Sequence, residues 1–368
     1  MCPERPGGLP LQFSALPPER RRCSLVITNY NGLANLKSFL PLNLRAVAEG
    51  SECDEVIVVD DGSTDRSVEY VERTFPRVKV VALERNRGFG ETANAGFAVA
   101  RNDFVVNISN DMVVAGDFFR HLFENMVLPD VFHVSARLVG PDGRLQKGRA
   151  IPFFAGEFKL WKLFSREPPV EEGPPRKLYH HFCGAIGLYD RRIFLELGGF
   201  DDLYLPFFVE ENDLCWRAWK RGYRVLYDPR AWLVHHHREA GTIAREYGRD
   251  VRKVQYRRNR LLFHWKNLTH PLYLLGHLAW VVLQLLFSWL SGHTVFYRGL
   301  ARALERWPAM LQKRRDEARF AVRSDFEVVR EFARELELPQ PSSPGGPPAT
   351  GERATGAGTG GAASVEIL

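Results

Sequence analysis

Four runs of apolar and β-branched residues lie between residues 23 and 108, and a polar or glycine-rich cluster follows each of them. Stretches with helical spacing of apolar residues come after the first three clusters, near Leu33, Ser67 and Ala93. Continuous apolar strands separated by helices are typical of a parallel sheet that is covered on both faces, so the pattern predicts an α/β fold. The predicted strands are Cys23–Thr28, Glu55–Asp60, Val78–Leu83 and Phe104–Ile108.

The polar clusters lie at the carboxyl ends of these strands, where open parallel sheets bind their ligands. They are Asn29–Gly32, Asp60–Asp65, Asn86–Gly90 and Ser109–Asp111. Asp60 and Asp61 suit hydrogen bonds to a ribose or a base, and a plain turn in which Asp65 caps the next helix explains them equally well. Asn110–Asp111 offers oxygen ligands of the kind that Mg²⁺ or Mn²⁺ shares with a diphosphate, although such a pair is often only a turn.

An acidic cluster follows the aromatic residues Phe207 and Phe208. It precedes the helical pattern that begins near Leu214. It consists of Glu210, Glu211 and Asp213. Capping of the helix accounts for Asp213 but leaves the two glutamates unexplained. A carboxylate in partly apolar surroundings can have a raised pKa and act as a general base toward a hydroxyl group, so we expect catalysis here.

Three histidines, residues 235–237, follow the predicted strand Trp232–Val234. Adjacent side chains on a strand point to opposite faces, so only alternate histidines can share one site. Such a triplet is more often a plain surface feature, but the acidic cluster upstream makes one of its members a candidate ligand for a metal or a diphosphate.

The composition excludes several classes of protein. The chain has 368 residues, of which 45% are hydrophobic, and its 50 Lys and Arg against 44 Asp and Glu give a formal net charge of +6. These values exclude a wholly disordered, collagen-like or disulfide-scaffold protein. The five cysteines are scattered and lack CxxC spacing, which favours a reducing, cytosolic environment. The segment Arg238–Lys266 holds nine basic and three acidic residues and so carries the whole excess of charge.

Taken together, these clusters resemble those of the inverting family 2 glycosyltransferases with a GT-A fold, particularly bacterial rhamnosyltransferase- and galactosyltransferase-like members. The similarity runs from about Cys23 to Asn267. Each motif alone is weak, whereas six in the family's order are very specific. The matching stretches are Thr28–Gly32, Val58–Asp65, Asn86–Gly90 with Asn94–Gly96, Asn107–Asp111, Glu210–Leu214 with Arg217, and Arg258–Asn259.

The resemblance implies a mostly parallel nucleotide-binding sheet with helices on both faces, and it implies roles for single residues. The nucleotide-sugar contacts that it implies are Thr28, Asn29, Tyr30, Asn31, Asp60 or Asp61, Arg87, Gly88 and Asn110. Asp111 would bind Mg²⁺ or Mn²⁺ as the last residue of a DxD-like motif, and His235 would approach the metal or the diphosphate. Glu211 stands at the position of the catalytic base, with Glu210 or Asp213 as its rival.

Three departures from the family pattern matter. Ser109 replaces the first acid of the metal motif, and Glu211 replaces the usual Asp. Residues 255–259 read QYRRN and so lack the aromatic residue of the QxxRW motif of processive synthases. We therefore expect an enzyme that adds one or a few sugars rather than a long polymer.

The resemblance implies an inverting hexosyltransferase of bacterial cell-surface glycan synthesis. It would move a sugar from a UDP-, dTDP- or GDP-linked donor to a hydroxyl of a saccharide or lipid-linked acceptor, or alternatively to a polyprenyl phosphate. An oxidoreductase is disfavoured because Ala93 replaces the third glycine of GxGxxG. The arginines of Arg249–Arg260 also suit a non-enzymatic protein that binds nucleic acid or anionic lipid, but we expect no nucleic-acid partner.

Asn267–Tyr297 is a run of 31 uncharged residues, more than the roughly 20 apolar residues that a membrane span needs. Basic residues on both sides suit a hairpin or in-plane segment better than a single crossing, and both spanning and interfacial forms stay open. No signal-peptide core occurs in residues 1–22, so we expect the cytoplasmic face of the inner membrane. The predicted organisation is disordered residues 1–22, a GT-A domain at 23–266, a membrane segment at 267–297, basic amphipathic helices at 298–338 and a disordered tail at 339–368.

Overall fold

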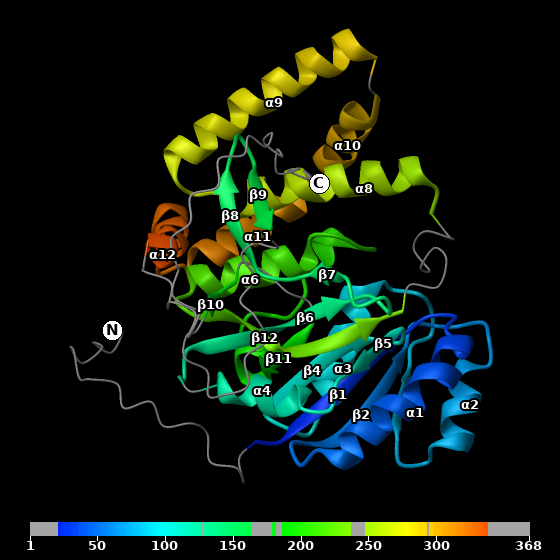
Figure 1. Ribbon diagram of the computed structural model, residues 1–368. Helices are drawn as coiled ribbons and strands as arrows, with labels where there is room; N and C mark the ends of the chain where they lie inside the picture. Colours follow the sequence, from blue (N-terminus) through cyan, green and yellow to red (C-terminus); the bar gives the residue numbers. More distant parts are fainter. Residues whose placement is uncertain are drawn as a thin grey trace, which may run out of the picture.

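The first four strands form the parallel part of one ten-stranded sheet, in the order β4-β1-β2-β3 (Figure 1). The computed structural model describes residues 21–126, 128–162, 179–181, 186–236, 247–292 and 294–337, so the predictions for residues 1–20 and 338–368 lie outside the described residues. The strands are β1 (Cys23–Asn29), β2 (Cys53–Asp60), β3 (Lys79–Ala82) and β4 (Phe104–Ser109). Each lies within two residues of its predicted bounds.

Helices cover both faces of this parallel part, as the continuous apolar strands require. Val26 packs with Phe97 of α3 on one face, whereas its neighbours Leu25 and Ile27 pack with Leu36 of α1 on the other. The helices that follow the first three strands are α1 (Leu33–Glu49), α2 (Ser67–Thr74) and α3 (Phe89–Val99). The predicted α/β fold with helices on both faces is thus confirmed.

The other part of the sheet contains antiparallel pairs that the sequence pattern did not reveal. Strand β11 (Gly187–Asp190) lies antiparallel between β4 and β6 (Val131–Val139), and β6 pairs in parallel with β12 (Arg224–His235). A Cβ atom on Gly187 would lie 2.0 Å from the Val134 carbonyl oxygen, so β11 can approach β6 only with glycine there. The shorter strands at the edges are β5 (Met112–Val114), β7 (Leu145–Lys147) and β10 (Tyr179–His180).

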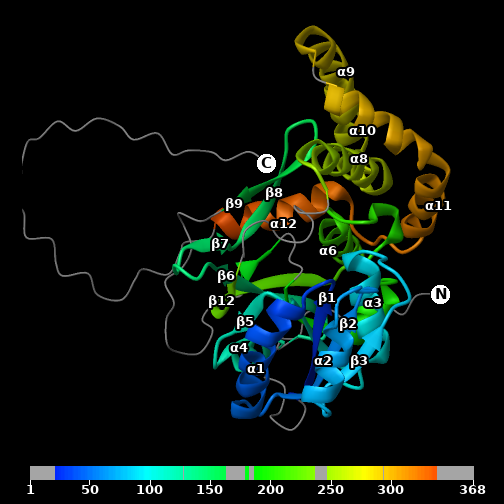
Figure 2. The ribbon, with the colours of Figure 1, turned by 90° about the vertical axis from the view of Figure 1, so that its right-hand side faces the viewer.

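A helical layer covers one side of the sheet, and a two-stranded sheet lies within it (Figures 1 and 2). Helix α6 (Glu210–Lys220) lies between the large sheet and the C-terminal helices. These are α8 (Arg249–Asn267), α9 (Pro271–Ser291), α10 (Thr294–Glu305), α11 (Trp307–Ala318) and α12 (Asp325–Glu337). The remaining elements are α4 (Phe118–Glu124), β8 (Ala150–Phe154), β9 (Phe158–Lys162), α5 (Arg191–Glu196) and the 3₁₀ helix η3 (Asp202–Tyr204).

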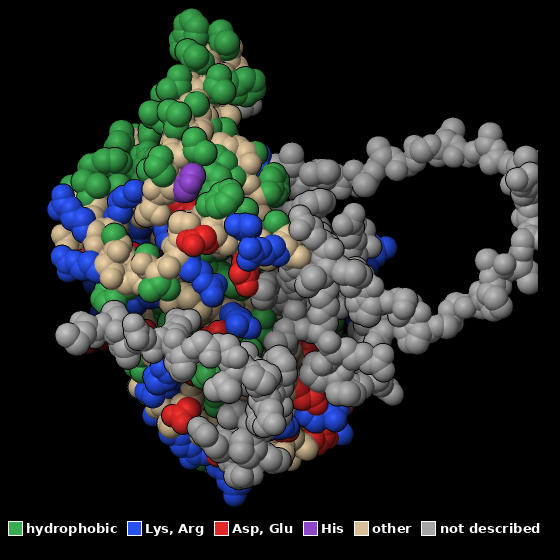
Figure 3. All heavy atoms as spheres, turned by 90° about the vertical axis from the view of Figure 1, so that its left-hand side faces the viewer, with side chains coloured by type: hydrophobic (Ala, Val, Ile, Leu, Met, Phe, Trp, Pro, Cys, Tyr) green, Lys and Arg blue, Asp and Glu red, His purple; other side chains and the backbone are tan. Residues whose placement is uncertain are grey.

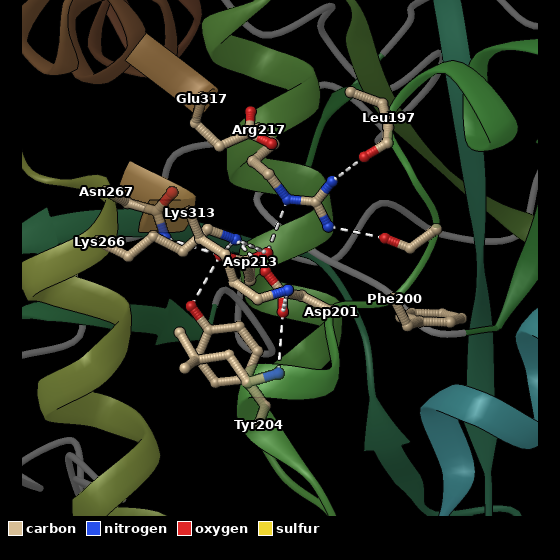
Figure 4. Close-up of polar contacts among 12 residues, drawn as sticks. Leu197, Phe200, Asp201, Tyr204, Asp213, Arg217, Lys266, Asn267, Lys313 and Glu317 are labelled. Atoms are coloured by element: carbon tan, nitrogen blue, oxygen red, sulfur yellow. Dashed lines mark hydrogen bonds and ion pairs between the residues drawn. The ribbon is translucent and has the colours of Figure 1, made fainter. Parts of the chain in front are cut away.

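A buried ion cluster around Asp213 joins α6 to α8 (Figure 4). The Asp213 carboxylate is fully buried and accepts hydrogen bonds from Lys266 at 2.9 Å and from Arg217 at 2.7 Å. Tyr204 and Asn267 donate to the same group. Burial alone would raise the pKa of Asp213, but the charges of Lys266 and Arg217 lower it below its usual value.

Further ion pairs extend this cluster to the end of the chain. Lys266 also binds Asp201 at 2.6 Å, and Lys313 of α11 binds the second oxygen of Asp201 at 2.7 Å. Lys220 of α6 pairs with Asp325 at the start of α12 at 2.9 Å. Helices α11 and α12 are therefore fixed to the same body as the sheet.

Replacing Lys266 by Met should leave the Asp201 and Asp213 carboxylates buried without their shared cation. We expect a loss of about 3 to 5 kcal/mol in the free energy of unfolding, measured by urea denaturation. Because the folded-state pKa values of both carboxyls are lowered, the wild-type protein loses this contribution as the pH falls below about 4, and the variant lacks it throughout.

The control is Arg45→Met, which breaks the exposed Arg45–Glu49 pair and should change stability by less than about 0.5 kcal/mol. Equal effects of the two substitutions would show that the buried cluster does not stabilise the fold.

Candidate active site

Asn29 joins the loops that follow the three central parallel strands. Its side-chain amide donates to Asp60 after β2 at 2.7 Å, and its side-chain oxygen accepts from Asn110 after β4 at 2.5 Å. Asp65 adds a second link, because its carboxylate accepts from the backbone N–H groups of Leu33 in α1 and Ser67 in α2. The polar clusters predicted at the strand ends thus meet at one edge of the sheet.

Both carboxylates of the Asp60–Asp61 pair are buried and shape the loops. Asp60 accepts from the backbone N–H and the hydroxyl of Ser63 at 2.8 and 2.6 Å. Asp61 accepts from the backbone N–H groups of Arg87 at 2.6 Å and Gly88 at 2.9 Å. Burial raises the pKa of Asp61, and these two hydrogen bonds oppose that shift. The capping prediction for Asp65 is confirmed as well, since it binds Ser67 at the start of α2.

The other predicted nucleotide contacts differ in exposure. Thr28 and Asn29 are buried, whereas Tyr30 is partly exposed and the Asn31 and Arg87 side chains are exposed. Gly88 has a φ of +87°, and a Cβ atom there would lie 2.3 Å from the Pro206 carbonyl oxygen. Glycine is therefore required where this loop touches the loop that precedes α6.

Asp111 and His235, which the family resemblance implies as metal ligands, face each other across neighbouring strand ends. His235 Nε2 lies 3.3 Å from Asp111 Oδ2, and His235 Nδ1 lies 2.9 Å from the side-chain oxygen of Gln146 in β7. The hydrogen bond from Nδ1 to Gln146 fixes the orientation of the ring, as is typical of metal-binding histidines. Asp111 Oδ1 is buried and has no hydrogen-bond partner among the described residues.

These two residues form a small ligand set. Within the described residues no group of three or more His, Cys, Asp or Glu side chains is placed to hold a metal ion. Of the other histidines in the triplet, His236 stacks on Phe39 at 4.4 Å between ring centroids, and residue 237 lies outside the described part.

Glu210 and Glu211 form the first turn of α6. Glu210 is buried, and its Oε2 atom has no hydrogen-bond partner among the described residues. Burial raises the pKa of Glu210 well above its usual value, the neighbouring Glu211 raises it further, and Lys147 opposes the shift. Glu211 is less buried than Glu210.

Strand β7 connects the acidic pair, Glu210 and Glu211, to the candidate metal pair, Asp111 and His235. Gln146 binds His235, and the next residue, Lys147, acts electrostatically on Glu210. The candidate ligands and the candidate base therefore lie around the same strand. Asp213, the third acid of the cluster, is turned away into the buried ion cluster with Lys266 and Arg217.

A clamp from α8 holds the loop 204–209 that leads into the acidic pair. The Asn259 side-chain amide donates to the carbonyl oxygens of Phe207 at 2.9 Å, Phe208 at 2.8 Å and Tyr204 at 2.6 Å. Gln255 and Arg258 both donate to the Leu205 carbonyl. Phe208 and Val209 have φ values of +77° and +78°, which side-chain-bearing residues rarely adopt, so the clamp holds a strained backbone directly before Glu210.

Sequence reasoning missed Gln146 and Lys147, which lie in a turn-rich stretch without a recognisable motif. It noted Arg258–Asn259 but not their function as a clamp. A signal was present there, since Gln255, Arg258 and Asn259 have the i, i+3, i+4 spacing that places three polar side chains on one helix face.

The family model described as Glycosyl transferase family 2 matches residues 24–198. The succinoglycan biosynthesis protein ExoO of Rhizobium meliloti (strain 1021) is 31% identical over 205 residues, which cover 54% of this chain and 57% of that protein. The pre-mycofactocin glycosyltransferase of Mycobacterium tuberculosis (strain ATCC 25618 / H37Rv) is 26% identical over 223 residues, which cover 60% of this chain and 44% of that protein. The chain thus spans about half the length of these two curated relatives.

Among solved structures, the crystal structure of GalNAc-T7 with UDP, GalNAc and Mn²⁺ is similar to the fold with a TM-score of 0.50. The sequence identity is 17%, and the match covers 67% of this chain and 48% of that chain. This similarity shows the fold.

Replacing Asn259 by Leu should release the loop before α6. Three carbonyl groups would lose the Asn259 donor, and because an unpaired buried group costs about 1 to 3 kcal/mol, we expect a total loss of about 2 to 5 kcal/mol in urea denaturation. Limited proteolysis should then cut within residues 204–209. The control, Asn212→Leu, changes a half-buried amide in α6 and should be nearly neutral; comparable losses would contradict the clamp.

Proposed function

Since residues 24–198 form a family 2 glycosyltransferase domain and the fold is GT-A, we propose that the whole chain transfers a sugar from a nucleotide-diphosphate sugar to an acceptor hydroxyl. One observation carries this proposal. The metal pair Asp111–His235 and the acidic pair Glu210–Glu211 both lie around β7, beside the loops that suit a nucleotide. A donor diphosphate and an acceptor hydroxyl can then be held together.

The donor is a UDP-, dTDP- or GDP-sugar. The Asn29–Asp60 hydrogen bond and those from the Arg87 and Gly88 backbone to Asp61 shape the nucleotide loops, which leaves the exposed side chains to meet the ligand. Tyr30 and Asn31 are placed to contact the nucleoside, and Arg87 to contact the diphosphate. Thr28, Gly88 and Asn110 support these contacts from the same loops.

The residues at Asp111 fit a divalent cation. The buried oxygen of Asp111 without a hydrogen-bond partner and the oriented Nε2 of His235 are ligands that suit Mn²⁺ or Mg²⁺ when the diphosphate completes the coordination. When bound, such a cation neutralises the charge that develops on the departing nucleotide diphosphate. Gln146 keeps His235 in the orientation that ligation needs.

Glu211 is the general base. It is the less buried carboxylate of the acidic pair, and so the one that an acceptor can reach. The raised pKa of Glu210 favours its neutral form, which keeps two negative charges from lying side by side. Glu211 removes the proton of the acceptor hydroxyl, whose oxygen attacks the anomeric carbon as the nucleotide diphosphate leaves, and this single displacement inverts the anomeric centre.

The acceptor is a saccharide or lipid-linked saccharide of bacterial cell-surface glycan synthesis, on the cytoplasmic face of the inner membrane. One relative is named a succinoglycan biosynthesis protein, which supports the glycan context. The long apolar helix α9 favours lipid-linked acceptors, including a polyprenyl phosphate as the second candidate.

Glu211→Gln should lower kcat by about 10² to 10⁴ with a panel of nucleotide sugars, because no carboxylate then takes the acceptor proton. Affinity for UDP, measured by calorimetry, should stay close to that of the wild type. Glu210→Gln is the matched control: glutamine has the shape of the neutral acid, so we expect less than about a tenfold loss. A larger loss in Glu210→Gln than in Glu211→Gln would make Glu210 the base.

Gln146→Leu should weaken Mn²⁺ binding in the presence of UDP by about 10- to 100-fold, since His235 loses the acceptor that orients its ring. Calorimetric titration with Mn²⁺ measures this directly, without turnover. Gln312→Leu, on the exposed side of α11, is the control and should bind Mn²⁺ like the wild type. Unchanged affinity in Gln146→Leu would remove His235 from the metal site.

A further inference from the structure

Helix α9 carries apolar residues all round, and a large share of them face solvent. Of the twenty large apolar side chains that are exposed in the described part of the chain, nine lie on this helix. They are Leu272, Leu275, Leu278, Val282, Leu283, Leu286, Phe287, Trp289 and Leu290. The two buried residues of α9 are His277 and Ser288. Tyr273, Leu274, Trp280 and Val281 pack against the core, so the exposed apolar residues form a second apolar side, which soluble proteins rarely leave uncovered.

The exposed apolar residues form one continuous side of the helix. At 100° per residue, the nine exposed positions fall within half of the helix circumference, and His277, Gln284 and Ser288 lie on the opposite half. In the space-filling view, hydrophobic side chains cover the outermost end of the molecule, where Figure 1 places α9 (Figure 3). The helix thus carries an apolar outer face, defined by the nine exposed residues.

The inner side of α9 is firmly attached to the protein. His277 Nδ1 lies 2.8 Å from the Gly156 carbonyl oxygen between β8 and β9, and its ring stacks on His264 of α8 at 4.7 Å. Trp280 packs so close to Gly156 that a Cβ atom there would lie 2.5 Å from the Trp280 Cβ. A spanning helix would have to give up these contacts along its length.

The chain on both sides of α9 is bound to the same body. Before α9, Lys266 joins the Asp213 cluster, and after it, Lys313 joins the same cluster through Asp201. Asp325 of α12 accepts hydrogen bonds from the backbone N–H groups of Thr269 and His270 at the very start of α9. A single crossing of the membrane would separate these partners on opposite sides.

Helix α10 adds positive charge beside the apolar outer face. It is held against α9 by packing of Phe296 on Trp280 and by a hydrogen bond from the Tyr297 hydroxyl to the Leu285 carbonyl. Arg298 and Arg302 of α10, together with Arg306 directly after it, recur every four residues and are exposed, with Glu305 as the one acid among them. Such a row of arginines complements the phosphates of anionic lipids.

We propose that α9 lies in the plane of an anionic membrane surface, with its apolar outer face among the acyl chains and the arginines of α10 at the lipid phosphates. The inference rests on the membrane location proposed above and not on the proposed chemistry. It excludes a transmembrane orientation of α9, and it places the whole described body on one side of the membrane.

Vesicle sedimentation of the purified full-length protein tests the docking surface. We expect binding to vesicles of phosphatidylcholine with phosphatidylglycerol and weaker binding to phosphatidylcholine alone. Leu283→Glu with Phe287→Glu should reduce binding by about tenfold or more for each side chain. The matched control, Leu42→Glu with Leu195→Glu, changes two equally exposed side chains on α1 and α5 and should bind like the wild type.

Arg302→Ala with Arg306→Ala should remove most of the preference for phosphatidylglycerol and leave the apolar component. Vesicle binding that is unchanged by the two substitutions in α9 would overturn the proposal. Light scattering tests the alternative. If the wild type forms a dimer and does not bind vesicles, and if Leu283→Glu with Phe287→Glu makes the protein monomeric, the apolar outer face binds a second copy of the chain instead of a membrane.

Extraction from membranes separates in-plane from spanning helices. Alkaline carbonate should release the full-length protein from membranes without detergent. If the protein resists carbonate extraction, α9 spans the membrane and the in-plane orientation is wrong. Neither assay measures sugar transfer, so loss of the proposed activity would leave this result standing, and failure of docking would leave the Glu211 and Gln146 results standing.

Discussion

The burial of the Asp213 carboxylate is the constraint on which the arrangement of the helical layer depends. A carboxylate with no exposed surface is tolerated only with cations and donors around it, and here they come from different parts of the chain: Arg217 from α6 itself, Lys266 and Asn267 from α8, and Tyr204 from η3. Through Asp201 the same cluster reaches Lys313 of α11. Because Asp213 lies one helical turn from Glu210, fixing it also fixes the start of α6, where the acidic pair stands. Asp213, one of the candidate bases in the sequence, thus has a structural role behind the acidic pair.

The loop before α6 shows how this support becomes a chemical geometry. Its two residues with positive φ, Phe208 and Val209, would relax to ordinary conformations if the backbone were free. Asn259 prevents this by pairing the carbonyl groups of Phe207 and Phe208. Processive synthases of this family have an aromatic residue at this position of the QxxRW motif. In this chain that position is Asn259, whose buried amide binds the loop backbone.

The parallel half of the sheet and its ligand edge could be predicted because their signals are local. A continuous apolar run such as Val56–Val59 has few structures open to it, and the polar residues after it must lie at a strand end. The family resemblance drawn from these motifs is confirmed by the match over residues 24–198. Strand β11 escaped prediction because its antiparallel place between β4 and β6 depends on contacts far away in the chain. Gln146 could not be predicted for the same reason. Its partner, His235, lies 89 positions away in the sequence, and only folding brings the two together.

The basic residues of α8 are divided between buried and exposed positions. The segment that holds the whole formal excess of +6 suggested a basic patch for an anionic partner. In the described part of that segment, however, Arg258, Arg260 and Lys266 are buried, and they bind the Leu205 carbonyl, Glu157, and the Asp201–Asp213 pair. These three side chains hold loops and acidic residues in place. Their charges therefore contribute little to the electric field outside the protein. Exposed basic side chains occur at Arg249 and Lys253 of α8 and also on α10, where exposed arginines follow the apolar helix. The same physical rule explains both cases. A buried cation needs an acceptor within the fold. An exposed cation beside an apolar face interacts best with lipid phosphates, at the boundary between the hydrocarbon and the headgroups.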